Sequence, residues 1–138
     1  MVKVILGKAG SGKTKQVIDM VNTAVTEESG SVVCIENGQT LRLSIKHDVK
    51  LVDISEYGME LSYDHLYAFI CGVYCGNYDI TQIFVDNFYK IIDTDNEALV
   101  AEVLGWLEAF SNANGVTVTL SLSGDADKAS EALKKYFI

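Results

Sequence analysis

Short apolar runs alternate along the chain with longer segments in which apolar residues recur every three or four positions. Four of the runs, at residues 2–6, 31–36, 81–86 and 116–122, have the length and composition of strands. The first two are apolar enough to be buried on both faces of a parallel sheet, and glycine or an Asn-Gly pair follows each of them.

Apolar residues at helical spacing predict three helices between the strands. The first covers residues 13–28, the second runs from a Ser62 cap to about Gly76, and the third starts at the capping-box sequence 94–97. Asp125 is the expected cap of a last helix. The apolar residues expected to face the sheet are Val17, Val21, Ala24 and Val25, then Leu66, Phe69, Ile70 and Val73, then Leu99, Val103, Trp106, Leu107 and Phe110, and finally Ala129, Leu133 and Tyr136 or Phe137.

Residues 40–54 follow a different pattern, because Leu41, Leu43 and Ile45 alternate with polar residues, as do Val49 and Leu51. Alternation of this kind indicates a sheet with one solvent-exposed face. Two interpretations fit: a hairpin, or an edge strand followed by a buried strand that ends at 54.

Strands that alternate with helices along the whole chain predict an α/β fold: a three-layer α/β/α sandwich with a mainly parallel central sheet. With 138 residues and no linker or low-complexity segment, residues 1–138 are expected to form a single domain.

The composition is that of a globular protein, with 49% hydrophobic and 22% charged residues and a net charge of −8. No apolar run reaches the ~20 residues that a bilayer-spanning helix needs, and no secretory signal is recognisable, so a cytoplasmic location without a membrane partner is expected. The 11 lysines and arginines form no basic cluster, which disfavours a nucleic-acid partner. A protein partner or a homo-oligomer remains open.

The three cysteines are expected to be reduced thiols. Cys71 and Cys75 share a helix face, but no further cysteine or histidine lies at the spacing of a zinc site, and His47 and His65 are far from each other. We therefore interpret the pair as packing residues.

The most informative stretch is Gly7-Lys8-Ala9-Gly10-Ser11-Gly12-Lys13-Thr14, which lies between a predicted buried strand and a predicted helix. Glycines in this G-x-x-x-x-G-K-T spacing let successive backbone N–H groups surround an anion, and the start of the helix adds its positive dipole end. The lysine reaches the β and γ phosphates of a nucleotide, and the threonine hydroxyl coordinates Mg²⁺. The candidate phosphate-binding residues are Gly7, Lys8, Ala9, Gly10, Ser11, Gly12, Lys13, Thr14 and Lys15.

The stretch LGKAGSGKT, together with the later IFVDN, resembles the Walker A and Walker B elements of P-loop nucleoside triphosphatases. The resemblance covers residues 2–122. It implies that Asp86, at the end of a buried strand, holds Mg²⁺ with Thr14, and that the cofactors are ATP and Mg²⁺. The segments VVCIENGQ, EYG and GNYDITQIFVDNFYKI are also similar to a small bacterial family that is sometimes labelled as ATPases or named after the twitching-motility retraction motor, which implies a nucleotide-binding fold.

Hydrolysis needs a group that orients or deprotonates the attacking water. In the RecA-like branch that the sequence resembles, a glutamate often follows the Walker B aspartate, and here that position is Asn87. Glu36 and Asp53 follow other predicted strands, and the carboxyl ends of strands are where ligands lie in open α/β sheets. The candidate catalytic residues are therefore Asp86, Glu36 and Asn87, although Glu36 and Asp53 also suit a turn and a loop.

Polar residues on the strand beside Walker B sense the γ phosphate in the RecA-like branch, and Ser121 or Ser123 fits that place. Arg42, the single arginine, suits either a solvated edge or a role toward a neighbouring subunit. One arginine is too few for the lid of a nucleotide kinase, and no Asn/Thr-Lys-x-Asp base-reading motif is present, so ATP is the expected nucleotide.

Three functions are compatible with these patterns. The first is an Mg-ATP-binding protein with slow ATPase activity. The second, motivated by Asn87, is a nucleotide-responsive binding module without useful turnover. The third is a small-molecule kinase whose acceptor lies near residues 55–65.

Overall fold

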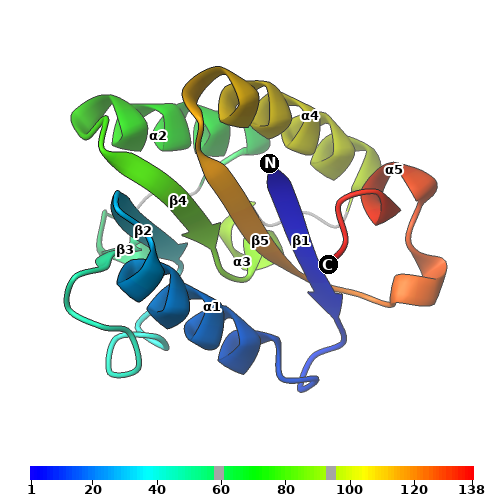
Figure 1. The fold of residues 1–138 in the computed structure, drawn as a ribbon. Coiled ribbons are helices and arrows are strands. Elements are labelled where there is room, and N and C mark those ends of the chain that lie inside the picture. The colour runs from blue at the N-terminus through cyan, green and yellow to red at the C-terminus, as the bar shows by residue number, and fades with distance from the viewer. Residues whose placement is uncertain (58–60, 93–95) are drawn as a thin grey trace.

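The computed structural model describes residues 1–57, 61–92 and 96–138 as a five-stranded sheet with helices on both faces (Figure 1). The strands are β1 (Val2–Gly7), β2 (Ser31–Glu36), β3 (Lys50–Asp53), β4 (Ile80–Val85) and β5 (Thr117–Ser123). The α-helices are α1 (Lys13–Glu27), α2 (Tyr63–Gly76), α3 (Phe88–Ile92), α4 (Glu97–Asn114) and α5 (Glu131–Lys134), and the 3₁₀ turns are η1 (Ile54–Tyr57) and η2 (Ala126–Lys128).

The sheet is parallel throughout, with the strand order β1-β5-β4-β2-β3. Helix α1 covers one face, and α2 and α4 cover the other (Figure 1). The expected three-layer α/β/α sandwich is therefore confirmed. Because β5 lies between β1 and β4, the loop after β1 and the residue after β4 are separated by two strand spacings.

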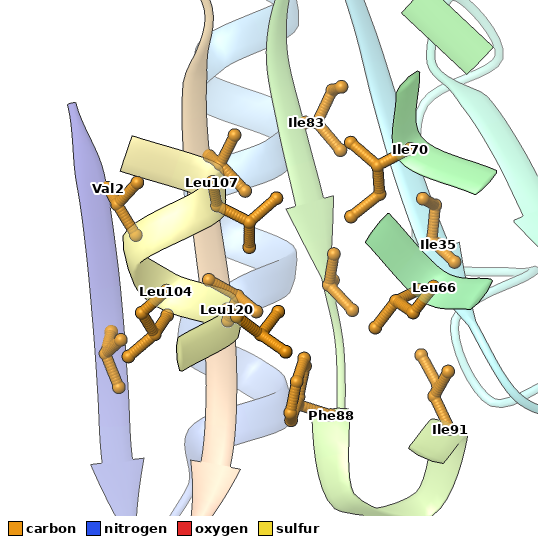
Figure 2. Packing of buried hydrophobic residues seen from close by; sticks show 14 of the residues in the cluster. Val2, Ile35, Leu66, Ile70, Ile83, Phe88, Ile91, Leu104, Leu107 and Leu120 are labelled. Carbon is orange, nitrogen blue, oxygen red and sulfur yellow. The ribbon is translucent and has the colours of Figure 1, made fainter. Parts of the chain in front are cut away.

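The apolar runs form strands because each of their two faces has a helix to pack against. In β2, Val33 and Ile35 belong to the core under α2 and α4, whereas Val32 and Cys34 belong to the core under α1. Figure 2 shows the larger core, in which Ile35, Leu66, Ile70, Ile83, Phe88, Leu104, Leu107 and Leu120 come together from the sheet and three helices. Among the described residues, no helix combines the length and apolarity that crossing a membrane would require.

Neither interpretation of residues 40–54 is confirmed: they form no hairpin, and the strand that ends near residue 54 is itself the edge strand. Only Lys50–Asp53 forms a strand, which pairs with β2 in parallel and lies at the edge of the sheet. The preceding segment is irregular: Leu41 is buried against α1, while Leu43 is 99% exposed. The Asn22 side chain of α1 donates to the Ser44 carbonyl at 2.8 Å and accepts from the Lys46 amide at 2.9 Å, so it satisfies backbone groups that a hairpin would have paired.

Helix α4 begins differently from the prediction. Thr94 and Asp95 of the expected capping box lie outside the described residues, and Asn96 is the cap, accepting from the amides of Ala98 at 3.0 Å and Leu99 at 3.4 Å. The buried face also differs slightly from the expected one, because Leu99 and Trp106 are only half-buried. The residues of α4 that are buried are Val100, Val103, Leu104, Leu107, Phe110 and Ser111.

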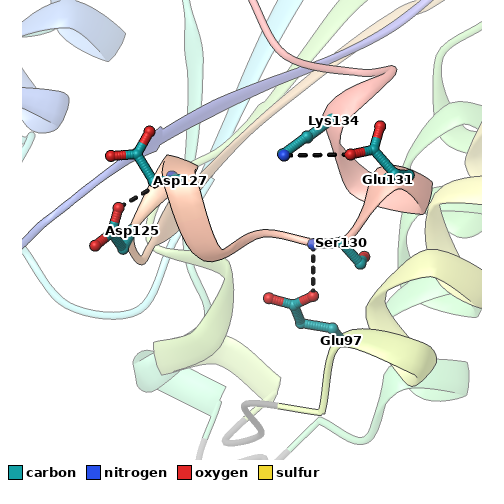
Figure 3. Close-up of polar contacts among 6 residues, drawn as sticks. All are labelled: Glu97, Asp125, Asp127, Ser130, Glu131 and Lys134. Atoms are coloured by element: carbon teal, nitrogen blue, oxygen red, sulfur yellow. Dashed lines mark hydrogen bonds and ion pairs between the residues drawn. The ribbon is translucent and has the colours of Figure 1, made fainter.

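The C-terminal segment corrects a further prediction, since Asp125 caps the short turn η2 and not the last helix (Figure 3). Ser130 caps α5, and its amide donates to Glu97 of α4 at 3.1 Å. The chain then passes along the outer edge of β1, where the Val4 amide donates to the Tyr136 carbonyl at 2.8 Å. One edge of the sheet is thus covered by the C-terminus, whereas β3 forms the opposite edge.

Candidate functional site

The glycine loop, residues 7–14, joins the end of β1 to the start of α1 as the motif requires. Gly10 and Gly12 have φ angles of 78° and 90°, in the left-handed region that favours glycine. A Cβ atom on Gly7 would lie 2.5 Å from Ser11 Oγ, so a side chain there would force Ser11 to move. The spacing of the three glycines is therefore required by the path of the backbone.

At the start of α1, the described residues provide neither a side-chain cap nor a first-turn acidic residue to balance the positive dipole end. Gly12 is the N-cap, no side chain caps the helix, and the first turn contains no acidic residue. Instead Lys13 and Lys15 lie there, although cations are unfavourable at a helix N-terminus. The first helical hydrogen bond joins the Gln16 amide to the Gly12 carbonyl at 3.1 Å. A bound anion would satisfy the free amides of this turn and offset the charge of the lysines.

Within the loop, the Lys8 carbonyl accepts two hydrogen bonds, from the Ser11 amide at 3.0 Å and from Lys13 Nζ at 3.2 Å. The Ser11 amide is therefore used inside the loop, so an anion bound here would be held by the amides of the other loop residues. The Gly7 carbonyl accepts from the Gly124 amide at 3.0 Å, which ties the loop to the end of β5. The loop is held by its own backbone and by the neighbouring strand.

Asp86 follows β4 and is 6% exposed. Its Oδ1 accepts from the Ser121 hydroxyl at 2.7 Å, and the same hydroxyl accepts from the Asn87 amide at 2.7 Å. One oxygen of the Asp86 carboxylate is thus fixed by the neighbouring strand β5. Two strand spacings of ~4.8 Å place Asp86 about 10 Å from β1 across the sheet.

The sheet register gives different positions to Ser121 and Ser123, the two serines expected to sense a phosphate. Ser123 lies opposite Gly7 and is exposed, whereas Ser121 is 1% exposed and contacts Asp86. Ser121 is thus the serine that links the strand between the two motifs to the carboxylate of the second. The sequence could identify both serines as candidates, but only the register selects one.

Asn87 has a positive φ of 55°, a conformation that asparagine tolerates better than most residues. Its carbonyl accepts from the Lys90 amide at 2.9 Å, which starts α3, and its side chain is exposed. The residue therefore turns the chain sharply beside Asp86. An amide side chain has no basic site, so Asn87 can orient a water molecule but cannot deprotonate it.

Glu36 lies beside Asp86, because β2 and β4 are neighbours and the Asp86 amide donates to the Ile35 carbonyl at 2.9 Å. It is 3% exposed and accepts from the amides of Thr40 at 3.1 Å and Leu41 at 3.4 Å. Burial raises the pKa of Glu36, the two amides lower it, and the nearby charges of Asp53 and Asp86 raise it again. Glu36 therefore lies next to Asp86, but its oxygens already close the turn after β2.

Asp53 lies opposite Glu36 on β3 and is also engaged locally. Its Oδ1 accepts from the Ser55 hydroxyl at 2.6 Å, the Gly38 amide at 2.8 Å and the Ser55 amide at 2.9 Å. The Ser55 hydroxyl is the main reason that the pKa of Asp53 is lowered. Sequence reasoning missed Ser55, although an aspartate two residues before a serine at a strand end is a recognisable turn signal.

The segment 55–65, expected near the acceptor of a kinase, is described only in part. Glu56 and Tyr57 line a hollow of about 490 Å³ beside β3, and residues 58–60 lie outside the described residues. Arg42 lines the same hollow and is exposed. No residue of the glycine loop lines it. Arg42 and the glycine loop therefore do not line the same hollow within one copy of the chain.

We predict that Glu36→Gln makes the stability of the protein less dependent on pH. Because the folded-state pKa of Glu36 is raised, protonated Glu36 stabilises the fold fully below its ordinary value of 4.5, and this contribution is lost as the pH rises through the raised pKa. Urea unfolding between about pH 4 and about pH 7 should show a larger loss of stability in the wild type than in the variant. Parallel profiles would show that Glu36 titrates alike in the folded and unfolded chains.

We predict that Ser121→Ala lowers the free energy of unfolding by about 1–3 kcal/mol, because it leaves buried Asp86 Oδ1 and the Asn87 amide without their partner. Thr119→Val is the matched control on the same strand. Thr119 Oγ1 is buried without a partner among the described residues, so its removal should leave stability unchanged or increased. Chemical denaturation measures both, and an equal loss in the two variants would contradict the role assigned to Ser121.

No model of a known protein family matches this chain, and no curated protein is significantly similar to it. Functional inference therefore depends on the geometry of the glycine loop and of the residues at the carboxyl ends of β4 and β2.

Proposed function

We propose that the protein binds Mg-ATP at the glycine loop and hydrolyses it slowly. The observation that carries this proposal is the start of α1, where three glycine-dependent turns lead into an uncapped helix whose first turn holds Lys13 and Lys15. Such a helix end is poorly balanced by the protein itself and suits a polyphosphate. ATP is preferred over GTP because no base-reading motif for guanine is present.

The residues around the loop also suit Mg²⁺. Thr14 is exposed in the first turn of α1, and Ser121 fixes Oδ1 of the Asp86 carboxylate. A hydroxyl and a carboxylate oxygen are the ligand types that Mg²⁺ takes from proteins, with water completing the shell. Thr14 and Asp86 would hold the ion, which supplies positive charge to the β and γ phosphates when bound.

Slow turnover is proposed because neither candidate base is well prepared. Asn87 has no basic group, and the oxygens of Glu36 are engaged by the amides of Thr40 and Leu41. Activation of water by Glu36 would require this turn to rearrange. A cytoplasmic location fits the proposal, since ATP is available there and the three cysteines are free thiols.

One observation favours a nucleotide-responsive module without useful turnover as the second candidate. The Ser121 hydroxyl joins Asp86 to the Asn87 amide, and Asn87 holds a left-handed turn that leads directly into α3. A ligand that competes for Asp86 would act on this turn and hence on α3. In this case binding, and not hydrolysis, would be the functional event.

Two measurements test these candidates. Calorimetric titration with Mg-ATP and Mg-GTP tests binding, and the proposal expects saturable binding of ATP in preference to GTP; no binding of either at millimolar nucleotide would overturn it. A single-turnover assay with protein in excess over radiolabelled ATP and with excess Mg²⁺ tests hydrolysis. Slow release of phosphate supports the ATPase, whereas intact ATP after prolonged incubation assigns the protein to the binding module.

A further inference from the structure

The hollow beside β3, here called the β3 hollow, is separate from the glycine loop. It is lined by strand β3, by the segment 38–49 that precedes it and by η1, and its volume is about 490 Å³. This volume is within the range of ~300–1,000 Å³ that is typical of sites for small molecules. Strands β1 and β3 lie at opposite edges of the sheet, four spacings or about 19 Å apart (Figure 1).

Cations are concentrated around the β3 hollow in a chain that is otherwise acidic. Arg42, Lys46 and Lys50 line it, which is three of the 11 lysines and arginines in a protein of net charge −8. His47 also lines it. Within the described parts of the chain, none of the three cations forms an ion pair, whereas Lys8 and Lys134 do. Three unpaired cations facing one hollow are suited to an anion.

Three carboxylates, those of Glu36, Asp53 and Glu56, also line the β3 hollow, and none forms an ion pair with its cations among the described residues, although the charge of Arg42 helps to lower the pKa of Asp53. Glu36 and Asp53 are buried, and their oxygens accept from the backbone of Gly38, Thr40 and Leu41 and from Ser55, except for Asp53 Oδ2, which is buried without a partner among the described residues. Glu56 is exposed beyond the end of β3. The cations that line the hollow are thus exposed, whereas two of its three carboxylates are buried.

The segment that carries the cations is held in place before any ligand binds. Asn22 of α1 donates to the Ser44 carbonyl at 2.8 Å and accepts from the Lys46 amide at 2.9 Å. The Val49 amide then donates to the Lys46 carbonyl at 3.1 Å, immediately before β3. A site that is ordered in this way loses less conformational entropy on binding.

We propose that the β3 hollow is a second ligand site, which binds a small molecule through a carboxylate or phosphate group held by Arg42, Lys46 and Lys50. The site shares no residue with the glycine loop, although Glu36, a candidate base of the nucleotide site, also lines the hollow. Arg42 contributes the planar group that pairs with both oxygens of such an anion, and the lysines add charge. The single arginine of the chain thus has a role within its own copy.

The test uses the fact that this chain contains one arginine, whose side chain gives one Nε–H signal in a ¹⁵N–¹H spectrum. Inorganic phosphate and malonate are titrated separately into labelled Lys13→Ala protein, in which the glycine loop is weakened as a competing anion site. Sodium chloride at equal ionic strength is the reference. We expect the Arg42 signal to shift saturably with at least one anion, and which anion does so identifies the group as phosphate or carboxylate.

Two variants make the result specific. Lys50→Ala should weaken the saturable shift by about fivefold or more, because a charge-assisted contact is lost. Lys134→Ala is the control, since Lys134 pairs with Glu131 far from the hollow and should leave the binding curve unchanged. A shift that is linear and equal to that caused by sodium chloride, or one that Lys50→Ala does not weaken, would overturn the proposal. Because the signal belongs to Arg42, a failure here leaves nucleotide binding at the glycine loop untouched.

Discussion

Replacing Lys13 with alanine is expected to weaken Mg-ATP binding by about a hundredfold, which corresponds to about 3 kcal/mol. Lys13 is half-buried at the start of α1, and its Nζ lies 3.2 Å from the Lys8 carbonyl, over the same loop that carries the free amides. A charged group held beside those amides adds a strong, charge-assisted hydrogen bond to a phosphate. Isothermal titration calorimetry with wild-type and variant protein measures the difference.

Lys15→Ala is the matched control, because Lys15 belongs to the same helical turn and carries the same charge. Its side chain is exposed, and the substitution keeps its backbone amide. An exposed, solvent-screened charge contributes at most about 1 kcal/mol, so affinity should fall by less than about fivefold. Equal losses in the two variants would mean that the loop attracts nucleotides only by its overall charge.

Phe88→Ala should have the largest effect on stability, lowering the free energy of unfolding by about 3–5 kcal/mol. Phe88 is fully buried among the residues that join the sheet to α2 and α4 (Figure 2). Its ring meets that of Tyr89 edge-on, with 6.1 Å between the ring centroids. Phe88 also follows Asp86 and Asn87 directly. Removing the ring leaves a cavity at the point where the chain turns beside the candidate metal ligand.

Tyr78→Ala tests whether the effect of Phe88→Ala comes from burial. Tyr78 is 72% exposed, and its ring contacts only Tyr74 among the described aromatic residues, at 5.4 Å. Its substitution should change the free energy of unfolding by less than about 0.5 kcal/mol in a urea titration. If Phe88→Ala costs no more than Tyr78→Ala, the packing described for α3 is wrong. Phe88→Leu should recover most of the lost stability.

The sheet could be predicted because four of its strands coincide with apolar runs in the sequence that are followed by turn residues. The run 31–36 coincides with β2, and the other three match β1, β4 and β5 to within one or two residues. In each case both faces of the strand are covered, so apolarity and strand formation have the same cause. Strand β3 lies at an edge and has no such run, and its four residues were therefore predicted only as part of a longer alternating segment.

The alternating segment misled because Leu41, Leu43 and Ile45 have different environments for reasons that lie outside it. Leu41 packs on α1, Leu43 projects into solvent, and the backbone between them is held by Asn22. A side chain twenty residues away thus replaces the strand pairing that periodicity alone suggests. The prediction for Asp125 failed for a different reason. Asp125 and Ser130 are both residue types that start helices, and Asp125 starts the short turn η2 whereas Ser130 starts α5.

The glycine loop could be predicted because all its residues are contiguous and their spacing has a direct geometric meaning. The link between Asp86 and Ser121 could not, because it depends on β5 lying between β1 and β4 and on the register of those strands. The pairing of β2 with β4 places Glu36 beside Asp86, as its position after β2 suggested. It is the local hydrogen bonding of Glu36 to Thr40 and Leu41 that the sequence does not reveal.

The most direct test of the central proposal is a ¹⁵N–¹H spectrum of wild-type protein titrated with Mg²⁺ and a non-hydrolysable ATP analogue. The proposal predicts saturable shifts of the amides at residues 9–15, together with that of Asn87, whose amide donates to the serine that holds Asp86. Spectra in which residues 9–15 stay unchanged at millimolar analogue would contradict a nucleotide site at the glycine loop.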